Sequence, residues 1–506
     1  MRESAAELTP AQFREAGHRL VDQIAEFLAT IAEKPVAPST SPHELRALIG
    51  GGGVPEQGTS PREILDHAAS LMFANSTFNG HPRFFGYITS SAAPIGALAD
   101  LLAAAVNSNC GAWGLSPMAT EIERQAIRWI AELIGYSPEA GGILVSGGNV
   151  ANMVCLITAI RAQAGWNVRA RGVGDPKRMR VYASSEVHTW LQKGADICGL
   201  GTDSFAPIAI DANEAMSIEA LRRAIANDRA NGLHPAIVVG TAGSVSTGAI
   251  DPLSEIAALC RAESLWFHVD GAYGAPAAML KDAPAELRAI ALADSVAVDP
   301  HKWLYAPLEA GCALVRNRKQ MHDAFVFHPP YYAFDGAAED PPTNFFEWGP
   351  QNSRGFRALK VWTTIRQVGR QGYVKMIGDD IELAREMHRL ASASEELEAF
   401  TQSLSITTFR YVPRDLRADP TAADYLNSLN KALLARLQEE GIVYVSNAVI
   451  GDAFVLRACI VNFRTNTSDI QAVIDAAIAG GRALDREMRE PATAPPDAVV
   501  QSDGAP

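Results

Sequence analysis

The sequence has few cysteines, no long hydrophobic segment and no excess of positive charge. Its six cysteines are far apart and form no Cys-x-x-Cys pair, which argues against a zinc site or a disulfide framework. No stretch of about 18 uncharged apolar residues occurs, so we expect no membrane span. The first residues, MRESAAELTP, lack the apolar segment of a secretory signal. With 44 basic and 57 acidic residues the net charge is −13, which argues against nucleic acid or an anionic membrane as a partner.

Hydrophobic residues, by contrast, make up 48% of the 506 residues, enough for a large buried core. At roughly 100–200 residues per domain, the chain should hold two or three domains, or one large α/β unit with appendages. Together with the absences above, this composition favours a soluble, cytoplasmic enzyme without a metal site.

The hydrophobic pattern divides the chain into four segments. Residues 1–84 contain helical patterns whose apolar stripes cannot form a core of their own, so this arm should pack on the rest of the chain or on a partner subunit. Strands alternating with helices predict a large domain over residues 85–385, and a shorter alternation predicts a small α+β domain over residues 386–488. Residues 489–506 are rich in proline and should form a disordered tail.

Short apolar strands are predicted in the large domain at residues 142–145, 181–184, 236–240, 265–269, 295–298 and 311–315. Most are apolar throughout, which is typical of a parallel sheet covered by helices on both faces. Polar residues follow directly after these strands. Because open α/β sheets bind ligands at the carboxyl ends of their strands, we expect the functional site at this edge.

Two of these strand ends carry groups of opposite charge. Lys302, in the segment Asp-Pro-His-Lys-Trp, has apolar and aromatic neighbours. Taken alone it could be a solvated surface lysine, but a buried lysine loses its charge readily and can form a Schiff base. Asp270, in His-Val-Asp-Gly-Ala-Tyr, follows another apolar strand, where a carboxylate needs a cation. A protonated pyridine nitrogen would be such a cation; an N-cap or a structural ion pair is the alternative.

Two further strand ends complete a pattern. The turn Ser-Gly-Gly-Asn at residues 146–149 opens a helix, and the free N–H groups of such a turn bind anions, although it could also be only a tight connection. It is not a Walker A loop. His188 follows another strand and is either structural or a flat ring for stacking. An imine-forming lysine, a carboxylate for a pyridinium, a phosphate cradle and a stacking ring are what pyridoxal phosphate (PLP) requires.

On these motifs the chain resembles the group II PLP-dependent amino-acid decarboxylases, the family of aromatic-L-amino-acid, tyrosine, histidine and glutamate decarboxylases. The resemblance covers roughly residues 10–480 and includes the segments His-Pro-Arg-Phe-Phe (81–85) and Arg-Gly-Phe-Arg-Ala-Leu-Lys (354–360). It implies PLP fold type I, which is aspartate-aminotransferase-like, with a large mainly parallel sheet domain, an N-terminal helical arm and a small C-terminal α+β domain. It also implies an obligate homodimer with shared active sites, in which the arm wraps the partner.

The resemblance also implies roles for individual residues. Lys302 would hold PLP covalently, Asp270 would keep the pyridine nitrogen protonated, and His188 would stack on the ring near the site of protonation. Ala272 would pack beneath the ring. The phosphate would be bound by Gly148, Asn149, the N–H of Val150 and His301.

The family has a mobile loop over the active site, here about residues 327–352. In the aromatic decarboxylases a tyrosine of this loop protonates the carbon that has lost CO2, and the register places Phe345 there. Phenylalanine has no proton to give, and in plant and insect relatives the same exchange accompanies aldehyde synthases. Tyr331 and Tyr332 in the same loop are alternative donors, and Phe345 could simply pack. Decarboxylation to an amine and O2-dependent aldehyde synthesis therefore both stay open.

The resemblance predicts substrate contacts at Asn79, Tyr87, Ile88, Thr89 and Gly111. By register, Asn79 and Gly111 replace aromatic residues of the animal enzymes, the second of which comes from the partner subunit. We therefore expect a wider and more polar pocket, which weakens but does not exclude an aromatic substrate, at roughly 0.5–1.5 kcal/mol per lost contact.

The favoured substrate is an L-amino acid with an aromatic or similarly bulky side chain. Arg457 could clamp a substrate carboxylate, as an arginine of the C-terminal domain does in aminotransferases of this fold, but we favour an ordinary ion pair within the small domain. A third hypothesis is a catalytically inactive PLP-binding scaffold, which the intact Lys302, Asp270 and His188 argue against.

Overall fold

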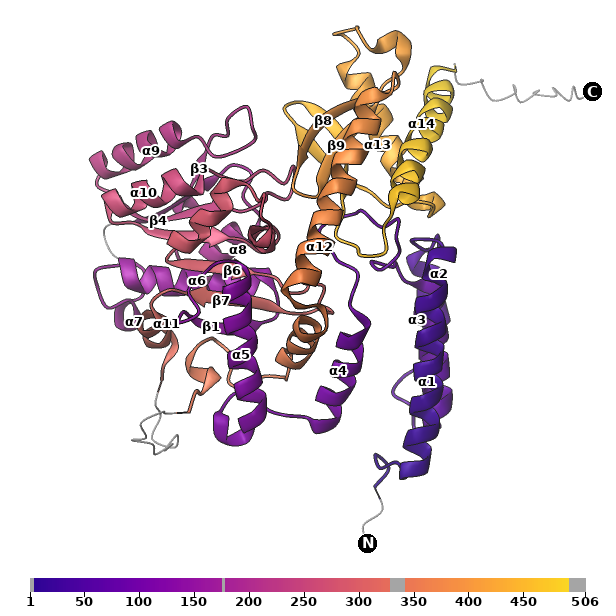
Figure 1. The fold of residues 1–506 in the computed structure, drawn as a ribbon, viewed down its shortest axis with the longest axis horizontal. Coiled ribbons are helices and arrows are strands. Elements are labelled where there is room, and N and C mark those ends of the chain that lie inside the picture. Colours follow the sequence, from indigo (N-terminus) through magenta and orange to yellow (C-terminus); the bar gives the residue numbers. More distant parts are fainter. Residues whose placement is uncertain (1–3, 175–177, 328–341, 491–506) are drawn as a thin grey trace, which may run out of the picture.

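The computed structural model describes residues 4–174, 178–327 and 342–490. Along the chain, an arm of helices is followed by a large α/β unit and a small α+β unit (Figure 1). The predicted α/β architecture, with a large mainly parallel sheet, is confirmed. None of the described helices is long and apolar enough to cross a membrane. The predicted tail from residue 491 onwards lies outside the described residues.

The arm consists of α1 (Pro10–Thr30), α2 (Pro42–Ile49) and α3 (Pro61–Asn75), each of which begins with a Ser or Thr cap followed by proline. Figure 1 shows α1 and α3 side by side, standing away from the large unit. Phe27 of α1 stacks on Phe73 of α3, with ring centroids 4.6 Å apart. The two helices thus pack on each other, while other apolar side chains of the arm stay exposed.

The large unit is built on a seven-stranded sheet. Its strands are β1 (Gly141–Val145), β2 (Met179–Ser184), β3 (Phe205–Ile208), β4 (His234–Thr241), β5 (Trp266–Asp270), β6 (Ser295–Val298) and β7 (Gly311–Val315). They lie in the order β1-β7-β6-β5-β4-β2-β3, and only β7 is antiparallel to its neighbours, β6 and β1. Every residue of β1, β5, β6 and β7 is buried. Because successive side chains of a strand point to opposite faces, both faces of the sheet are covered.

The helices of the large unit precede, connect or follow these strands. They are α4 (Pro94–Val106), α5 (Pro117–Leu133), α6 (Gly148–Gln163), α7 (Val168–Arg171), α8 (Trp190–Ile197), α9 (Ile218–Ala230), α10 (Leu253–Glu263) and α11 (Arg318–Phe325). α6 packs on β4, β5, β6 and β7, the centre of the sheet. Its first residue directly follows the turn after β1, so the amino end of α6 lies at the carboxyl edge of the strands.

The helix α12 (Ala358–Ala393) leads from the large unit to the small one and bends at Gly369, whose φ is +65°. The small unit has an antiparallel sheet in the order β10-β11-β9-β8. Its elements are β8 (Leu397–Ser403), β9 (Ile406–Tyr411), α13 (Ala423–Glu440), β10 (Ser446–Ile450), β11 (Ala453–Cys459) and α14 (Thr467–Arg489). The predicted domain boundary between residues 385 and 386 falls within α12 and stays a prediction.

The segment after the arm runs from the small unit to the strand ends of the large one. Phe85 is buried in the core of the small unit, and its N–H donates to the carbonyl of Tyr444 at 2.7 Å. Five residues later, the hydroxyl of Ser90 donates to the carbonyl of His301 at 2.8 Å. This segment therefore joins the small unit to the turn that carries Lys302.

Candidate active site

The strand ends singled out in the sequence surround one cavity of about 350 Å³. The turn after β1 and the ends of β2, β5 and β6 all contribute to its wall, because these strands run in the same direction and end at the same edge of the sheet. The predicted cofactor-binding residues that line it are Gly148, Asn149, His188, Asp270, Ala272, His301 and Lys302. Val150 follows Asn149 on α6 but does not line the cavity.

Lys302 reaches this cavity from a tight turn after β6. Its side chain is 21% exposed, and its Nζ lies 3.1 Å from Oδ2 of Asp299. The backbone N–H of Lys302 donates to the carbonyl of Asp299 at 2.9 Å, and its own carbonyl accepts the N–H of Tyr305 at 3.1 Å. The lysine is thus largely withdrawn from solvent and held by a defined turn, unlike a solvated surface lysine.

Asp270 ends β5 and is 7% exposed. One carboxylate oxygen accepts the indole N–H of Trp190 at 2.7 Å, and the other accepts the backbone N–H of Ala272 at 3.2 Å. Within the described chain Asp270 has no ion-pair partner, and it caps no helix, so neither alternative from the sequence holds. A buried carboxylate with neutral donors alone still favours a cation from a ligand.

His268, two residues before Asp270 on β5, is also buried. His268 bonds through its two ring nitrogens to Oγ of Ser295 at 2.9 Å and to Oδ1 of Asn152 at 2.7 Å. Burial lowers the pKa of His268 to about 4, so its ring is neutral at pH 7. Its ring meets Trp190 edge-on, with centroids 5.8 Å apart. His268 therefore supports the indole that holds Asp270.

His188 lines the cavity from the loop between β2 and α8. Its Nδ1 accepts the backbone N–H of Trp190 at 3.2 Å, so the ring proton of neutral His188 lies on Nε2. Burial lowers the pKa of His188, although the charge of Asp270 opposes that shift. A neutral imidazole with its N–H on the free side can stack on a flat ring and can donate a proton.

The turn after β1 fits a phosphate group. Gly147 has φ +114°, and a Cβ on Gly148 would lie 2.6 Å from Oδ2 of Asp299, so only glycine leaves the backbone N–H groups open here. His301 is fixed by its Nδ1, 2.7 Å from the carbonyl of Ala310. Two buried atoms of cavity-lining residues, Oγ1 of Thr241 and Oδ1 of Asp299, have no hydrogen-bond partner in the described chain. These features fit PLP.

Most of the predicted substrate contacts do not line this cavity in the single chain. Ile88 does, but Asn79, Tyr87, Thr89 and Gly111 do not. Tyr87 is 60% exposed, with φ +53°. A Cβ on Gly111 would lie 2.1 Å from the carbonyl oxygen of Asn352, so glycine is needed there for close packing. The absence of a side chain at Gly111 is thus no evidence of a wider pocket.

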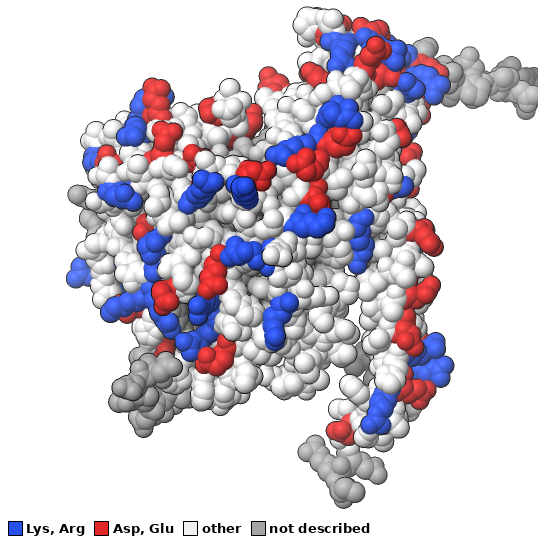
Figure 2. Space-filling model, in the orientation of Figure 1, with Lys and Arg blue, Asp and Glu red and all other residues white. Residues whose placement is uncertain are grey.

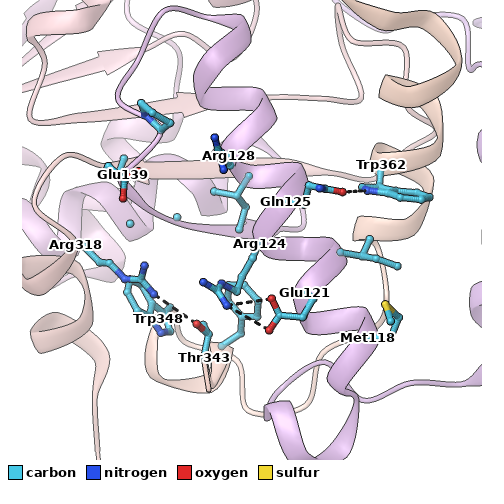
Figure 3. Close-up of a pocket in the computed structure, with 17 residues that line it drawn as sticks. Met118, Glu121, Arg124, Gln125, Arg128, Glu139, Arg318, Thr343, Trp348 and Trp362 are labelled. Carbon is cyan, nitrogen blue, oxygen red and sulfur yellow. Dashed lines mark hydrogen bonds and ion pairs between the residues drawn. The ribbon is translucent and has the colours of Figure 1, made fainter. Parts of the chain in front are cut away.

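Phe345 lines a different cavity. It is 2% exposed, and the Arg354 guanidinium lies 4.9 Å from its ring centre. This second cavity, of about 530 Å³, lies between α5 and the segment that contains Thr343 and Trp348 (Figure 3). Phe345 therefore does not reach the Lys302 cavity of its own chain. The alternative donors, Tyr331 and Tyr332, lie outside the described residues.

Arg457 contradicts the predicted ion pair. It is 2% exposed on β11 and faces Ser446 and Thr408 on the neighbouring strands, neither of which is acidic. Its Nη1 donates to the carbonyl of Tyr87 at 2.9 Å and to Oγ of Ser446 at 3.1 Å. Its Nε and Nη2 have no partner in the described chain. Arg457 thus holds the backbone of a predicted substrate-contact residue instead of a carboxylate.

Sequence reasoning missed Trp190 and Thr241. Trp190 follows His188 by two residues, and its indole was hard to assign because its partner, Asp270, is 80 residues away. Thr241 ends β4, so the rule that strand ends carry the site could have included it. In the described part of the chain, no cluster of His, Cys, Asp or Glu side chains is arranged to hold a metal ion.

The chain is similar to known proteins over most of its length. The family model described as "Pyridoxal-dependent decarboxylase conserved domain" matches residues 42–412. An aromatic-L-amino-acid decarboxylase of Bacillus atrophaeus is 31% identical over 469 residues, which cover 92% of this chain and 95% of that protein. A phenylacetaldehyde synthase of Petunia hybrida is 28% identical over 461 residues, which cover 89% of this chain and 90% of that protein.

Among solved structures, that of Oryza sativa TDC with PLP and tryptamine superposes with a TM-score of 0.87. The match covers 96% of this chain and 100% of that one, at 24% sequence identity. This likeness confirms the predicted fold class.

Proposed function

We propose a substrate for this chain, which belongs to the pyridoxal-dependent decarboxylase family and is thus a PLP-dependent amino-acid decarboxylase. The substrate is an L-amino acid with an aromatic or similarly bulky side chain, from which the enzyme releases CO2 and an amine. The observation that carries this proposal is the single cavity that brings together Lys302, Asp270, His188 and the turn before α6. Its apolar lining residues, Ile88, Val245 and Leu308, are suited to a bulky side chain.

Bound PLP supplies an electron sink for the electron pair that CO2 leaves behind. Lys302 would hold the cofactor covalently, and the N–H groups of Gly148 and Asn149, with His301, would bind its phosphate. The N–H of Val150 is predicted to join them, although Val150 does not line the cavity. Asp270 holds a proton at the pyridine nitrogen, since its carboxylate is fixed by Trp190 and has no cation of its own. Ala272 packs beneath the ring.

His188 has two tasks in this proposal. Its ring stacks on the cofactor, which orients the cofactor, and the fixed Nδ1 leaves the Nε2–H facing the cavity. Because burial lowers its pKa, His188 is neutral and its Nε2–H is a weak but positioned acid. Within the described chain, His188 lines the cavity together with Lys302, the other group there that can move a proton.

The test of the substrate class is a panel of L-amino acids, assayed for CO2, amine, aldehyde, ammonia and peroxide together. The proposal expects aromatic amino acids to have the highest kcat/KM. Preference for glutamate or another acidic amino acid would reject it.

The alternative product is an aldehyde, and Phe345 supports it. The overall reaction, amino acid + O2 + H2O giving aldehyde + CO2 + NH3 + H2O2, needs the carbon that lost CO2 to stay unprotonated long enough to meet O2. Phenylalanine at this position cannot donate a proton. The relatives of this chain include phenylacetaldehyde synthases as well as decarboxylases. We keep the amine as the main product, because Tyr331, Tyr332 and His188 remain as donors.

We expect some aldehyde and peroxide beside the amine in the wild type. A Phe345→Tyr variant should lower the aldehyde-to-amine ratio roughly 10- to 100-fold, because a positioned acid speeds proton transfer by that order or more. The measurement is product analysis with O2 uptake. Phe346→Tyr, on the next residue, is the matched control and should leave the ratio unchanged. Amine alone, with no O2 uptake by the wild type, would reject the aldehyde alternative.

The active protein is, we propose, a homodimer with shared active sites. α4 presents Leu98, Leu101, Leu102 and Val106 to solvent, each 53–62% exposed, and the surface over α4 is mainly uncharged (Figure 2). So continuous an apolar surface is typical of an interface. Tyr87 and Asn79, which do not reach the Lys302 cavity of their own chain, would then be available to the partner's site, whereas Phe345 is buried within its own chain.

Leu102→Asp should therefore weaken the dimer and lower the activity with it, because a carboxylate buried in an apolar interface costs several kcal/mol. Analytical ultracentrifugation and turnover, measured over the same concentration range, check this expectation. Val449→Asp, at a side chain 56% exposed on the small sheet, is the control. A monomeric wild type with full activity would contradict the shared-site proposal.

A further inference from the structure

One carboxylate outside the cavity holds the turn that presents Lys302. Oδ2 of Asp380, on α12, accepts the indole N–H of Trp303 at 2.8 Å and also the hydroxyl of Tyr305. Both donors follow Lys302 within three residues. Asp380 is 77 residues away from Trp303 in the sequence, and no motif pointed to it.

Asp380 is buried and has no cation beside it. It is 2% exposed, and Trp303 and Tyr305 are fully buried. Among the described residues no lysine or arginine pairs with it, and the backbone N–H of Asn462, after β11, is near enough to lower its pKa. Burial raises the pKa of Asp380 to about 7, while the three donors lower it. A carboxylate in such a place is costly, so its neutral donors must compensate for the lost water.

The same face of α12 makes a further contact with this turn. The hydroxyl of Tyr373 donates to the carbonyl of Leu304 at 3.0 Å. Tyr373 and Asp380 are seven residues apart, a spacing that places them on one face of a helix. α12 therefore holds three consecutive residues after Lys302: the indole of Trp303, the carbonyl of Leu304 and the hydroxyl of Tyr305.

The turn after Lys302 also contacts the segment that follows Asp270. Trp303 stacks on Tyr273, with ring centroids 4.9 Å apart and planes at 20°. Tyr273 comes three residues after Asp270, and its hydroxyl lies 2.7 Å from Oγ of Ser405. The indole that Asp380 orients is thus the packing surface between the lysine turn and the Asp270 strand end.

We propose that Asp380 is a positioning residue, which orients Trp303 and Tyr305 and thereby fixes the direction from which Lys302 meets the cofactor. It does not touch the reacting atoms. The inference rests on the proposed role of Lys302 as the cofactor lysine. Because α12 leads into the small unit and Asn462 belongs to that unit, Asp380 also ties the placement of the lysine to the placement of the small sheet.

The test is Asp380→Asn, with Asp379→Asn as the matched control. Asp379 is the preceding residue on the same helix, but its side chain is 56% exposed and pairs with Lys375 on the surface. Asparagine can keep one oxygen for both donors, since both bond to Oδ2, but it removes the negative charge and puts an N–H2 group in the place of Oδ1. We expect kcat to fall about 10- to 100-fold with KM nearly unchanged, since small displacements of a catalytic group cost that much. The visible absorbance of lysine-bound PLP, and its pH dependence, should shift as well. The control should match the wild type in all of these.

A purely structural role would lower the melting temperature without moving the PLP spectrum or the kcat of the folded fraction, and that result would overturn the proposal. If Asp380→Asn does not fold, Tyr305→Phe removes one donor and keeps the ring. We expect its spectrum to shift in the same direction. The double variant should lose no more activity than Asp380→Asn alone, because both changes break one interaction; independent, multiplying losses would overturn the proposal.

The experiment separates this inference from the proposed site. Borohydride reduction of the wild type, followed by peptide mass spectrometry, locates the cofactor lysine without reference to Asp380. A label away from Lys302 rejects the proposed site. A label on Lys302, with an unchanged spectrum and kcat in Asp380→Asn, rejects only the positioning role.

Discussion

Lys302→Ala should abolish covalent attachment of PLP and lower kcat by roughly 1,000-fold or more, because in the proposed site the lysine both anchors the cofactor and can move protons next to it. The structure supports this expectation with a lysine that is 21% exposed, lines the cavity and follows a fully buried strand. Borohydride reduction of the wild type fixes the cofactor on its amine. Mass spectrometry should then place the pyridoxyl group on Lys302, and the variant should carry none.

Lys193→Ala is the matched control for this experiment. Lys193 lies on α8, near enough for its charge to act on His188, but it does not line the cavity. Its variant should keep both the label and a kcat within about threefold of the wild type, as expected for a substitution outside a site. A pyridoxyl label on Lys193, or on any other lysine, would contradict the assignment.

The central strands of the large sheet and its edge strand β1 could be predicted, but the opposite edge strand, β3, could not. β5, β6 and β7 are buried on both faces, so their sequences are apolar throughout and stand out. β3 is an edge strand of only four residues, Phe-Ala-Pro-Ile, which are apolar but include a proline, a residue that argues against a strand. β8 is likewise an edge strand whose residues are mostly half-buried. Burial on one side only leaves too weak a pattern in so short a segment.

The candidate site could be predicted where its residues follow strands. Lys302, Asp270 and His188 lie within a few residues of apolar runs, and the parallel sheet brings such positions to one edge. Trp190, Asp380 and Arg457 lie in the sequence without such a marker. Their partners are 80, 77 and 370 residues away, and only the folded chain brings them together. The predicted ion pair of Arg457 was wrong for this reason: its neighbours on adjacent strands were unknown.

Asp270→Asn should leave PLP bound to Lys302 but lower kcat by at least about 100- to 1,000-fold, the usual cost of losing a preorganised charge that stabilises the transition state. A carboxylate can hold a proton on the pyridine nitrogen, whereas a neutral amide cannot, and the protonated ring is what accepts the electron pair. The measurements are the pyridoxyl label, the PLP content and kcat. Near-normal turnover in this variant would reject the role of Asp270.

Two further variants separate charge from packing. Trp190→Phe removes the N–H that donates to Asp270 at 2.7 Å but keeps a large ring, so kcat should fall less than in Asp270→Asn. Asp294→Asn changes a carboxylate that accepts the N–H of Phe267, near the end of β5 opposite to Asp270. It should affect stability more than kcat. A PLP analogue methylated at the ring nitrogen carries a permanent positive charge, so it should restore part of the turnover of Asp270→Asn. If it does not, the lost activity reflects the geometry of β5 instead of the charge on the ring.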